Sequence, residues 1–277
     1  MALTLSRRIG AAEVTVLTDG ALSFPPALFP RTGQATIDTL LDLAGEKDIR
    51  TNFNAVLIRG GGQTVLVDAG FRDLVGAACG HLPQALAAAG AQVGDIDRLF
   101  TTHLHADHVA GMITTEGRAV FPRAELVLTA PEHAFWTETS FFSTADQQLQ
   151  DWQRLAQAVL DAYADRLVII QPGDQIAPGL WSLPLPGHTP GHSGWRLSSG
   201  DRMLVHMGDI VHAQKLQLAD PEIGIAFDLD MDMARQTRKR LLDELATDGT
   251  LVTGGHILHP ALGRVVRHGS GYRFEDA

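Results

Sequence analysis

The chain alternates short apolar runs, typical of β-strands, with longer segments in which apolar residues recur at helical spacing. Strand-like runs occupy residues 13–18, 54–59, 63–68, 98–102, 125–129, 167–170, 180–185, 194–198 and 202–207. Helical spacing is found over 83–89, 131–163 and 232–245. Gly60-Gly61-Gly62 predicts a hairpin between two of the runs, and a second hairpin is expected over 264–274. Because no stretch has linker composition, the pattern predicts a single α/β domain with mixed sheets over residues 1–277.

Composition excludes several classes of protein. The chain has 45% hydrophobic residues, which excludes intrinsic disorder, and its net charge of −10 argues against a nucleic-acid partner. A single cysteine, Cys79, excludes disulfides and cysteine-based zinc clusters and suits a reducing compartment. The start lacks the apolar stretch of a signal peptide, and no apolar run approaches the roughly 18 residues of a membrane helix. We therefore expect a cytoplasmic protein with no membrane partner.

The strongest chemical signal is an HxHxDH run formed by His103, His105, Asp107 and His108. It directly follows the apolar run 98–102, so these side chains would gather where a buried strand ends. Imidazole and carboxylate groups without thiolate suit Zn²⁺, Mn²⁺ or Fe²⁺. The run therefore predicts a metal site.

Three further polar residues each follow an apolar run and stand beside glycine, namely His188, Asp209 and His256. Each alone would be weak evidence, because a histidine after a strand is commonly a hydrogen-bonded loop residue. Together with the HxHxDH run they supply seven ligands, as two adjacent cations use when one carboxylate bridges them. The neighbouring glycines would let the backbone approach a crowded centre.

The order HxHxDH, GHTPGHS, GD and GH resembles the metallo-β-lactamase-fold hydrolase superfamily, over nearly the whole chain. The resemblance implies an αββα sandwich with a dinuclear site at one edge, between two mixed sheets. It also implies that Asp68 orients a ligand histidine instead of binding metal. It places His103, His105 and His188 on one metal and Asp107, His108 and His256 on the other, with Asp209 as the bridge.

The C-terminal third of the chain narrows the resemblance to one branch of the superfamily. The stretches 208–212, 227–230, 254–256, 263–264 and 271–274 resemble the methyl parathion hydrolase-like branch, which contains phosphotriesterases and lactonases. The main class of zinc β-lactamases instead has a cysteine ligand where Asp209 stands. A glyoxalase-type thioesterase and a non-catalytic metal-binding scaffold stay open as alternatives.

These features together predict a hydrolase with two divalent metal ions, expected to be Zn²⁺, that attacks lactones or carboxylic esters, with phosphotriesters as a further candidate substrate class. A metal-bridging hydroxide would be the nucleophile, and catalytic Asp107 would orient it and pass its proton to the leaving group. The resemblance also suggests a homodimer. His212, His259 and an aromatic wall of Phe135, Trp136, Phe141 and Phe142 are candidates for the substrate cleft, with loop or helix packing as the alternative.

Overall fold

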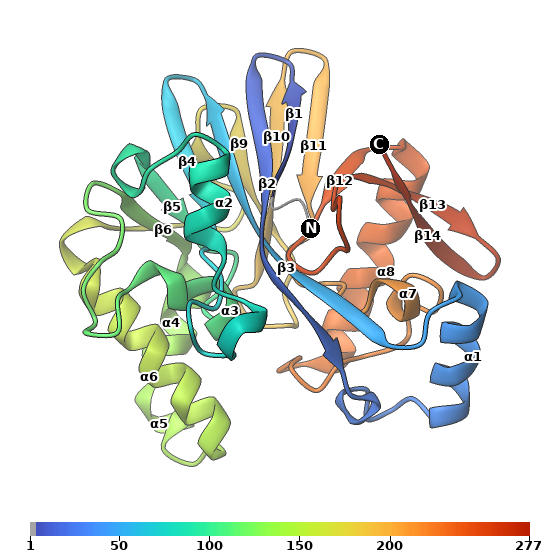
Figure 1. Ribbon diagram of the computed structural model, residues 1–277. Coiled ribbons are helices and arrows are strands. Elements are labelled where there is room, and N and C mark those ends of the chain that lie inside the picture. The colour runs from blue at the N-terminus through green and yellow to red at the C-terminus, as the bar shows by residue number, and fades with distance from the viewer. Residues whose placement is uncertain (1–3) are drawn as a thin grey trace.

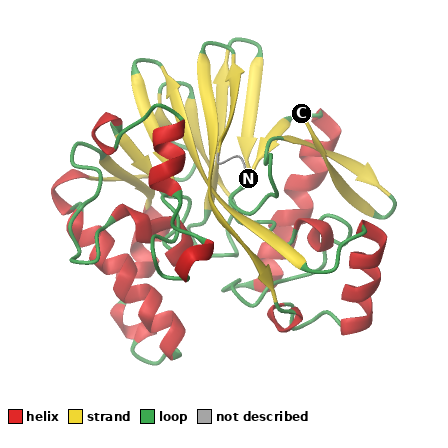
Figure 2. Ribbon diagram, viewed as in Figure 1, coloured by secondary structure: helices red, strands yellow, loops and turns green. Residues whose placement is uncertain are grey.

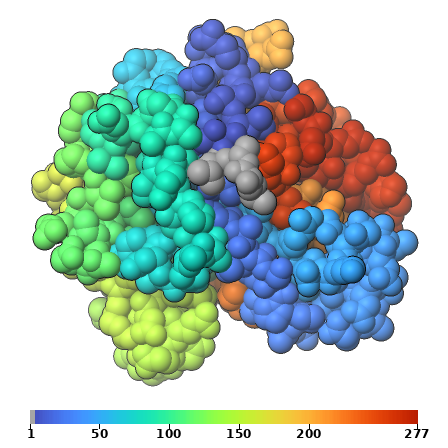
Figure 3. Space-filling view, in the orientation of Figure 1, coloured from blue at the N-terminus to red at the C-terminus, as the bar shows by residue number. Residues whose placement is uncertain are grey.

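Two seven-stranded β-sheets lie face to face between outer helices in the computed structural model, which describes residues 4–277 (Figures 1 and 2). This arrangement confirms the αββα sandwich. In Figure 3, β1 and β2 (dark blue) lie between the green residues of the first half and the red C-terminal residues.

The first sheet is ordered along the chain from β1 to β7. The pairs among β1, β2, β3 and β4 are antiparallel, and β4, β5, β6 and β7 are parallel. The strands span Thr4–Ile9 (β1), Ala12–Phe24 (β2), Ile49–Gly60 (β3), Gln63–Val67 (β4), Arg98–Phe100 (β5), Glu125–Thr129 (β6) and Leu167–Ile170 (β7).

The second sheet runs from β8 at one edge to β14 at the other. Only β11 and β12 pair in parallel, and the other pairs are antiparallel. The strands span Gln175–Ala177 (β8), Leu180–Pro184 (β9), Ser193–Ser199 (β10), Arg202–His206 (β11), Leu251–Thr253 (β12), Gly263–His268 (β13) and Gly271–Asp276 (β14).

Helices cover the outer face of each sheet (Figure 1). They span Gln34–Ala44 (α1), Leu82–Ala88 (α2), Ala106–Val109 (α3), Ala130–Thr137 (α4), Thr139–Phe142 (α5), Gln147–Ala162 (α6), Gln214–Gln217 (α7) and Met231–Asp248 (α8). Of the helices within residues 4–277, none combines the length and apolarity needed to cross a bilayer.

The strands are apolar on both faces because both faces are buried. On β3, Leu57 packs against the helices over the first sheet, whereas Val56 points to the layer between the sheets. That inner layer also includes Trp195 and Leu204 of the second sheet. Parallel strands end at the same edge of a sheet, so β4 and β5 of the first sheet, and likewise β11 and β12 of the second, deliver the loops after them to a common edge.

Most predicted elements are confirmed, including both hairpins, whose turns contain Gly61, Gly62 and Gly269 with positive φ. Strand β1 and helix α1 were not predicted, although Ile37, Leu40, Leu41 and Ala44 of α1 stand at helical spacing. The helical stretch predicted over 131–163 is interrupted. Glu138 has extended backbone, and Asp146 starts a new helix by accepting a hydrogen bond from the backbone N–H of Leu149 at 2.9 Å.

Candidate metal centre

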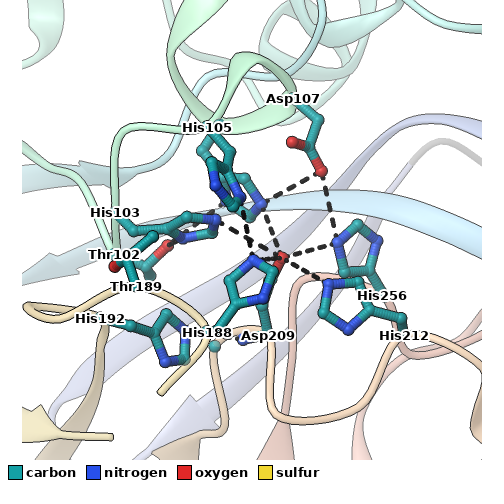
Figure 4. Close-up of polar contacts among 12 residues, drawn as sticks. Thr102, His103, His105, Asp107, His188, Thr189, His192, Asp209, His212 and His256 are labelled. Carbon is teal, nitrogen blue, oxygen red and sulfur yellow. Dashed lines mark hydrogen bonds and ion pairs between the residues drawn. The ribbon is translucent and has the colours of Figure 1, made fainter. Parts of the chain in front are cut away.

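The seven residues predicted to bind metal all lie together at one edge of the two sheets, and Figure 4 labels all of them except His108. His103 to His108 follow β5, His188 lies in the loop between β9 and β10, and Asp209 and His256 follow β11 and β12. All but Asp107, which is partly buried, are buried. Strand ends from both sheets therefore build one site.

The donor atoms fall into two groups, each with its atoms within 4.8 Å of one another. The first donor group consists of His103, His105 and His188; the second donor group consists of Asp107, His108, Asp209 and His256. Asp209 Oδ2 lies 3.7 Å from His103 Nε2 and 3.6 Å from His188 Nε2, both in the first donor group. The same oxygen lies 3.1 Å from His108 Nε2 and 2.8 Å from His256 Nε2. One carboxylate oxygen thus faces both groups.

Hydrogen bonds at Nδ1 fix how three of the imidazoles are oriented. Nδ1 of His108 lies 2.8 Å from Asp68 Oδ2, and Nδ1 of His188 lies 2.9 Å from Asp228 Oδ1. Nδ1 of His256 lies 2.9 Å from the carbonyl oxygen of Asn52. Each of these oxygens accepts, so Nδ1 carries the proton and Nε2 presents its lone pair to the centre of the site.

Asp68 is held in the left-handed region, with φ of 58°, where a residue other than glycine is uncommon. Its carboxylate accepts hydrogen bonds from the backbone N–H and the hydroxyl of Thr102, both at 2.9 Å, besides the bond from His108. Such a backbone conformation persists only where its surroundings determine it, as they do in this buried turn.

The expectation that glycines let the backbone approach the centre is confirmed at Gly255. A Cβ atom there would lie 2.6 Å from Asp209 Oδ1 and 3.3 Å from His108 Cε1. Any side chain at this position would displace the carboxylate that faces both donor groups.

The chemistry of the donor set fits divalent cations. His103 Nε2, His105 Nε2 and Asp209 Oδ1 are buried without a hydrogen-bond partner among residues 4–277. Nδ1 of His188 donates its proton to Asp228, so Nε2 of His188 carries a lone pair. This lone pair faces Nδ1 of His105 at 3.0 Å. Buried lone pairs that converge without donors are matched by a cation, and imidazole with carboxylate suits zinc.

The pKa values of the imidazoles differ between the two donor groups. Burial and the neighbouring His108 hold the pKa of His103 well below its ordinary value. Burial also disfavours the charged form of His256, but the adjacent Asp209 and Asp107 raise its pKa to about 10. The two carboxylates of the second donor group therefore favour positive charge beside them, whether it comes from protons or from a metal ion, whereas burial keeps His103 of the first donor group neutral.

His192 and His206 are buried histidines that make contacts within the fold and are not among the seven predicted ligands. His192 donates from Nδ1 to the carbonyl oxygen of Leu185 at 2.7 Å and accepts from the N–H of Asp209 at 2.9 Å, so both ring nitrogens are occupied. His206 is a buried strand residue, and its ring stacks on Trp195 with 5.2 Å between centroids.

A cavity of about 220 Å³ opens onto the site. Its polar lining includes Asp107 and His212, whereas His259 is exposed and lies outside it. Its large apolar side chains come from several separate segments of the chain: Leu22, Phe24, Phe53, Phe71, Trp152 and Phe227.

Of the two alternatives for Phe135, Trp136, Phe141 and Phe142, helix packing agrees with the structure, because none of them lines the cavity. Trp136 and Phe142 are buried and stacked on each other in the helical layer, and Phe141 is 45% exposed. The turn of α4 directs Trp136 inward, where its indole N–H donates to Glu132 at 2.6 Å. Trp152 on α6 is the aromatic residue of this segment that reaches the cavity.

Two acidic residues at the site were not identified as site residues from the sequence. Asp228 contacts His188 across 40 positions of the chain, and Glu132 accepts a hydrogen bond from the N–H of Leu104 at 2.9 Å. Asp228 lies in the stretch 227–230 that carries the resemblance, but nothing in the sequence linked it to His188, and no pattern pointed to Glu132.

Comparisons with known proteins agree with this geometry. A family model described as "Metallo-beta-lactamase superfamily" matches residues 51–256. A protein of Mycobacterium bovis named "Probable metallo-hydrolase" is 27% identical over 137 residues, which cover 43% of this chain and 38% of that protein. The chain thus matches well under half the length of this curated relative.

Two solved structures are similar over the whole chain. The dizinc quorum-quenching lactonase AidC, in complex with the product N-hexanoyl-L-homoserine, has a TM-score of 0.92 at 25% identity and is covered over 99% of its chain. The hydrolase AbOPH of the beta lactamase superfamily has a TM-score of 0.92 at 28% identity and is covered over 98%. Both matches cover 100% of this chain.

Proposed function

The chain belongs to the metallo-beta-lactamase superfamily, and on that premise we propose that it is a dinuclear metal hydrolase of lactones and carboxylic esters. The observation that carries the proposal is the position of Asp209 Oδ2 between the two donor groups. A carboxylate in that place suits a bridge between two cations. We propose in the same way that residues 1–277 form one domain, since a single apolar layer joins both sheets.

In this proposal the first donor group holds one cation and the second donor group the other, with Asp209 shared. Zinc is proposed because the donors are nitrogen and oxygen and because the structurally similar lactonase AidC is described as dizinc. When bound, two such ions would lower the pKa of a water to about 7 and polarise the carbonyl oxygen of a substrate.

Asp107 is proposed to move the proton. Its Oδ2 lies 3.2 Å from His108 Nε2 and 3.3 Å from His256 Nε2, and the residue lines the cavity. It is therefore placed between the second donor group and the space where a substrate would lie. A carboxylate there can orient the attacking water and carry its proton to the leaving alkoxide.

The cavity supports an acyl substrate. Phe24 and Trp152 each lie 6.0 Å, centroid to centroid, from Phe227, so three aromatic rings make an apolar wall beside the metal ligands. His212, whose Nε2 lies 3.3 Å from Asp209 Oδ2, adds a polar group at the floor. An apolar wall with few polar groups favours an acyl chain but discriminates weakly between chains.

Turnover of a substrate panel tests the proposal. The panel holds N-hexanoyl-L-homoserine lactone, a δ-lactone, an aryl ester, a phosphotriester, a glutathione thioester and a β-lactam, each with zinc-loaded protein. We expect lactone or carboxylic-ester hydrolysis to exceed β-lactam hydrolysis by a wide margin. A β-lactam as the best substrate, or no turnover of any ester while two metals are bound, would overturn the proposal. The thioester as the best substrate would support the glyoxalase-type alternative.

A further inference from the structure

Glu132 is a buried carboxylate outside both donor groups. It lies in the first turn of α4, is 1% exposed and does not line the cavity. Its Oε1 accepts hydrogen bonds from the backbone N–H of Leu104 at 2.9 Å and the indole N–H of Trp136 at 2.6 Å. Its Oε2 accepts from the hydroxyl of Thr189 at 2.5 Å.

Two of these partners are chain neighbours of the proposed metal ligands. Leu104 stands between His103 and His105, and Thr189 directly follows His188. These three histidines make up the whole first donor group. The two oxygens of one carboxylate therefore join the loop after β5 to the loop between β9 and β10, which come from different sheets.

The backbone around Glu132 is locked to the same loop. A Cβ atom on Gly191 would lie 2.1 Å from the backbone nitrogen of Glu132, so the loop lies directly against α4. The hydroxyl of Thr129, at the start of α4, donates to the carbonyl oxygen of Gly191 at 2.9 Å. The helix cannot shift without moving the segment that contains His188.

The polar contacts require an acceptor at this position. A backbone N–H and an indole N–H can only donate, so Oε1 must accept from both. Burying a carboxylate is costly unless its hydrogen bonds are satisfied, and an apolar side chain in its place would leave these buried donors unpaired. The retained carboxylate therefore points to a requirement for defined geometry between the two loops.

We propose that Glu132 is a positioning residue that sets the separation of His188 from His103 and His105, and thereby the affinity of the first donor group for its metal ion. This inference rests on the proposed metal centre. Glu132 contacts neither the metal ligands' donor atoms nor the cavity, so its effect would pass through Leu104 and Thr189.

Two variants that each remove one hydrogen bond to Glu132 separate this role from a general contribution to folding. Thr189→Val removes the bond to the loop that contains His188. Trp136→Phe removes the hydrogen bond that the indole N–H donates to the same carboxylate, and this bond connects to neither loop. The variant retains an aromatic ring against His105. Glu132→Leu removes all three bonds, and Glu132→Gln keeps an oxygen able to accept from Leu104 and Trp136.

The measurements are the zinc dissociation constants by competition with a chromophoric chelator, the absorption spectrum of the Co²⁺-substituted protein, and urea unfolding of the metal-free protein. We expect Thr189→Val and Glu132→Leu to weaken binding of one of the two ions by roughly 10–100-fold and to change the Co²⁺ spectrum. Trp136→Phe should lower resistance to urea but keep wild-type affinity and spectrum. Glu132→Gln should lie closer to wild type than Glu132→Leu.

Equal effects of Thr189→Val and Trp136→Phe on metal affinity would overturn the positioning role. Wild-type affinity in all variants that fold would overturn it as well. Should Glu132→Leu fail to fold, Thr189→Val and Glu132→Gln still decide the question. A wild-type protein that does not bind two ions would instead refute the proposed metal centre itself, so the two failures are distinguishable.

Discussion

Asp68 Oδ2 accepts a hydrogen bond from His108 Nδ1 at 2.8 Å, and this bond directs His108 Nε2 to Asp209 Oδ2, 3.1 Å away. Asp68 thus contacts Nδ1 of His108, the ring nitrogen that points away from the centre of the site, whereas Asp209 faces both donor groups. The two carboxylates should therefore respond differently to substitution.

Asp68→Ala is expected to weaken metal affinity by roughly 10–100-fold, as loss of a residue that orients a ligand typically does. Asp209→Ala is expected to cost both metal occupancy and activity, because the bridge would serve two cations at once. Elemental analysis and chelator competition measure both effects. Asp73→Asn, on the same loop but with its side chain 66% exposed, is the matched control and should bind metal normally. If Asp68→Ala abolished binding as fully as Asp209→Ala, the assigned roles would be wrong.

Metal removal should destabilise the protein as well as inactivate it. The donor groups bury converging lone pairs and two carboxylates, so an ion that binds only the folded chain stabilises it by mass action, by about 2.7 kcal/mol at 100 times the dissociation constant. We expect two zinc ions per chain by elemental analysis, and a lower melting temperature after chelation that zinc restores. One ion or none, even after zinc is supplied, contradicts the dinuclear site.

The sequence predicted the metal cluster because its members follow strands. Asp209 comes after β11 and His256 after β12, and because these two strands run parallel in one sheet they deliver both residues to the same edge, while His103 and His105 come after β5 of the other sheet. The run of alternating histidines was therefore informative before any packing was known.

The remainder of the site depends on contacts that local patterns do not encode. Asp228 reaches His188 from the loop before α8, and Glu132 reaches Leu104 from α4. The cavity wall combines Phe24 and Phe227, which are 203 positions apart in the chain. The aromatic-rich stretch near Trp136 was a misleading signal, because its rings pack mainly against one another and the helical layer.

His206 should make the free energy of unfolding depend on pH. Burial lowers its pKa to about 4, and its Nδ1 accepts from the N–H of Gly208 at 3.0 Å. In the unfolded chain the pKa is about 6.5. Between these values the unfolded state binds more protons, so stability is fully present above about pH 6.5 and is lost as the pH falls towards 4.

We therefore expect His206→Gln to reduce the loss of unfolding free energy between pH 6.5 and pH 4.5 by about 2 kcal/mol relative to the wild type. Urea unfolding of metal-free protein at several pH values measures this difference. His259→Gln, which also replaces a histidine but at an exposed position, is the control for the substitution itself. Parallel profiles for His206→Gln and the wild type would contradict the buried neutral state.

Trp152 should determine how well long acyl chains bind, since it lines the cavity and its ring lies 4.7 Å from that of His105. Removing a large apolar contact from a substrate pocket costs about 1–3 kcal/mol, so Trp152→Ala should lower kcat/KM for N-hexanoyl-homoserine lactone by roughly 5–150-fold. The loss should be smaller for the N-acetyl analogue, whose chain is too short to cover the wall. Phe141→Ala changes an aromatic residue of the same helical segment that lies outside the cavity, so it should leave both rates unchanged. Equal losses with both lactones would show that Trp152 acts by packing against His105 and not by contacting the acyl chain. A loss with Phe141→Ala would show that the cleft extends to the tip of α5.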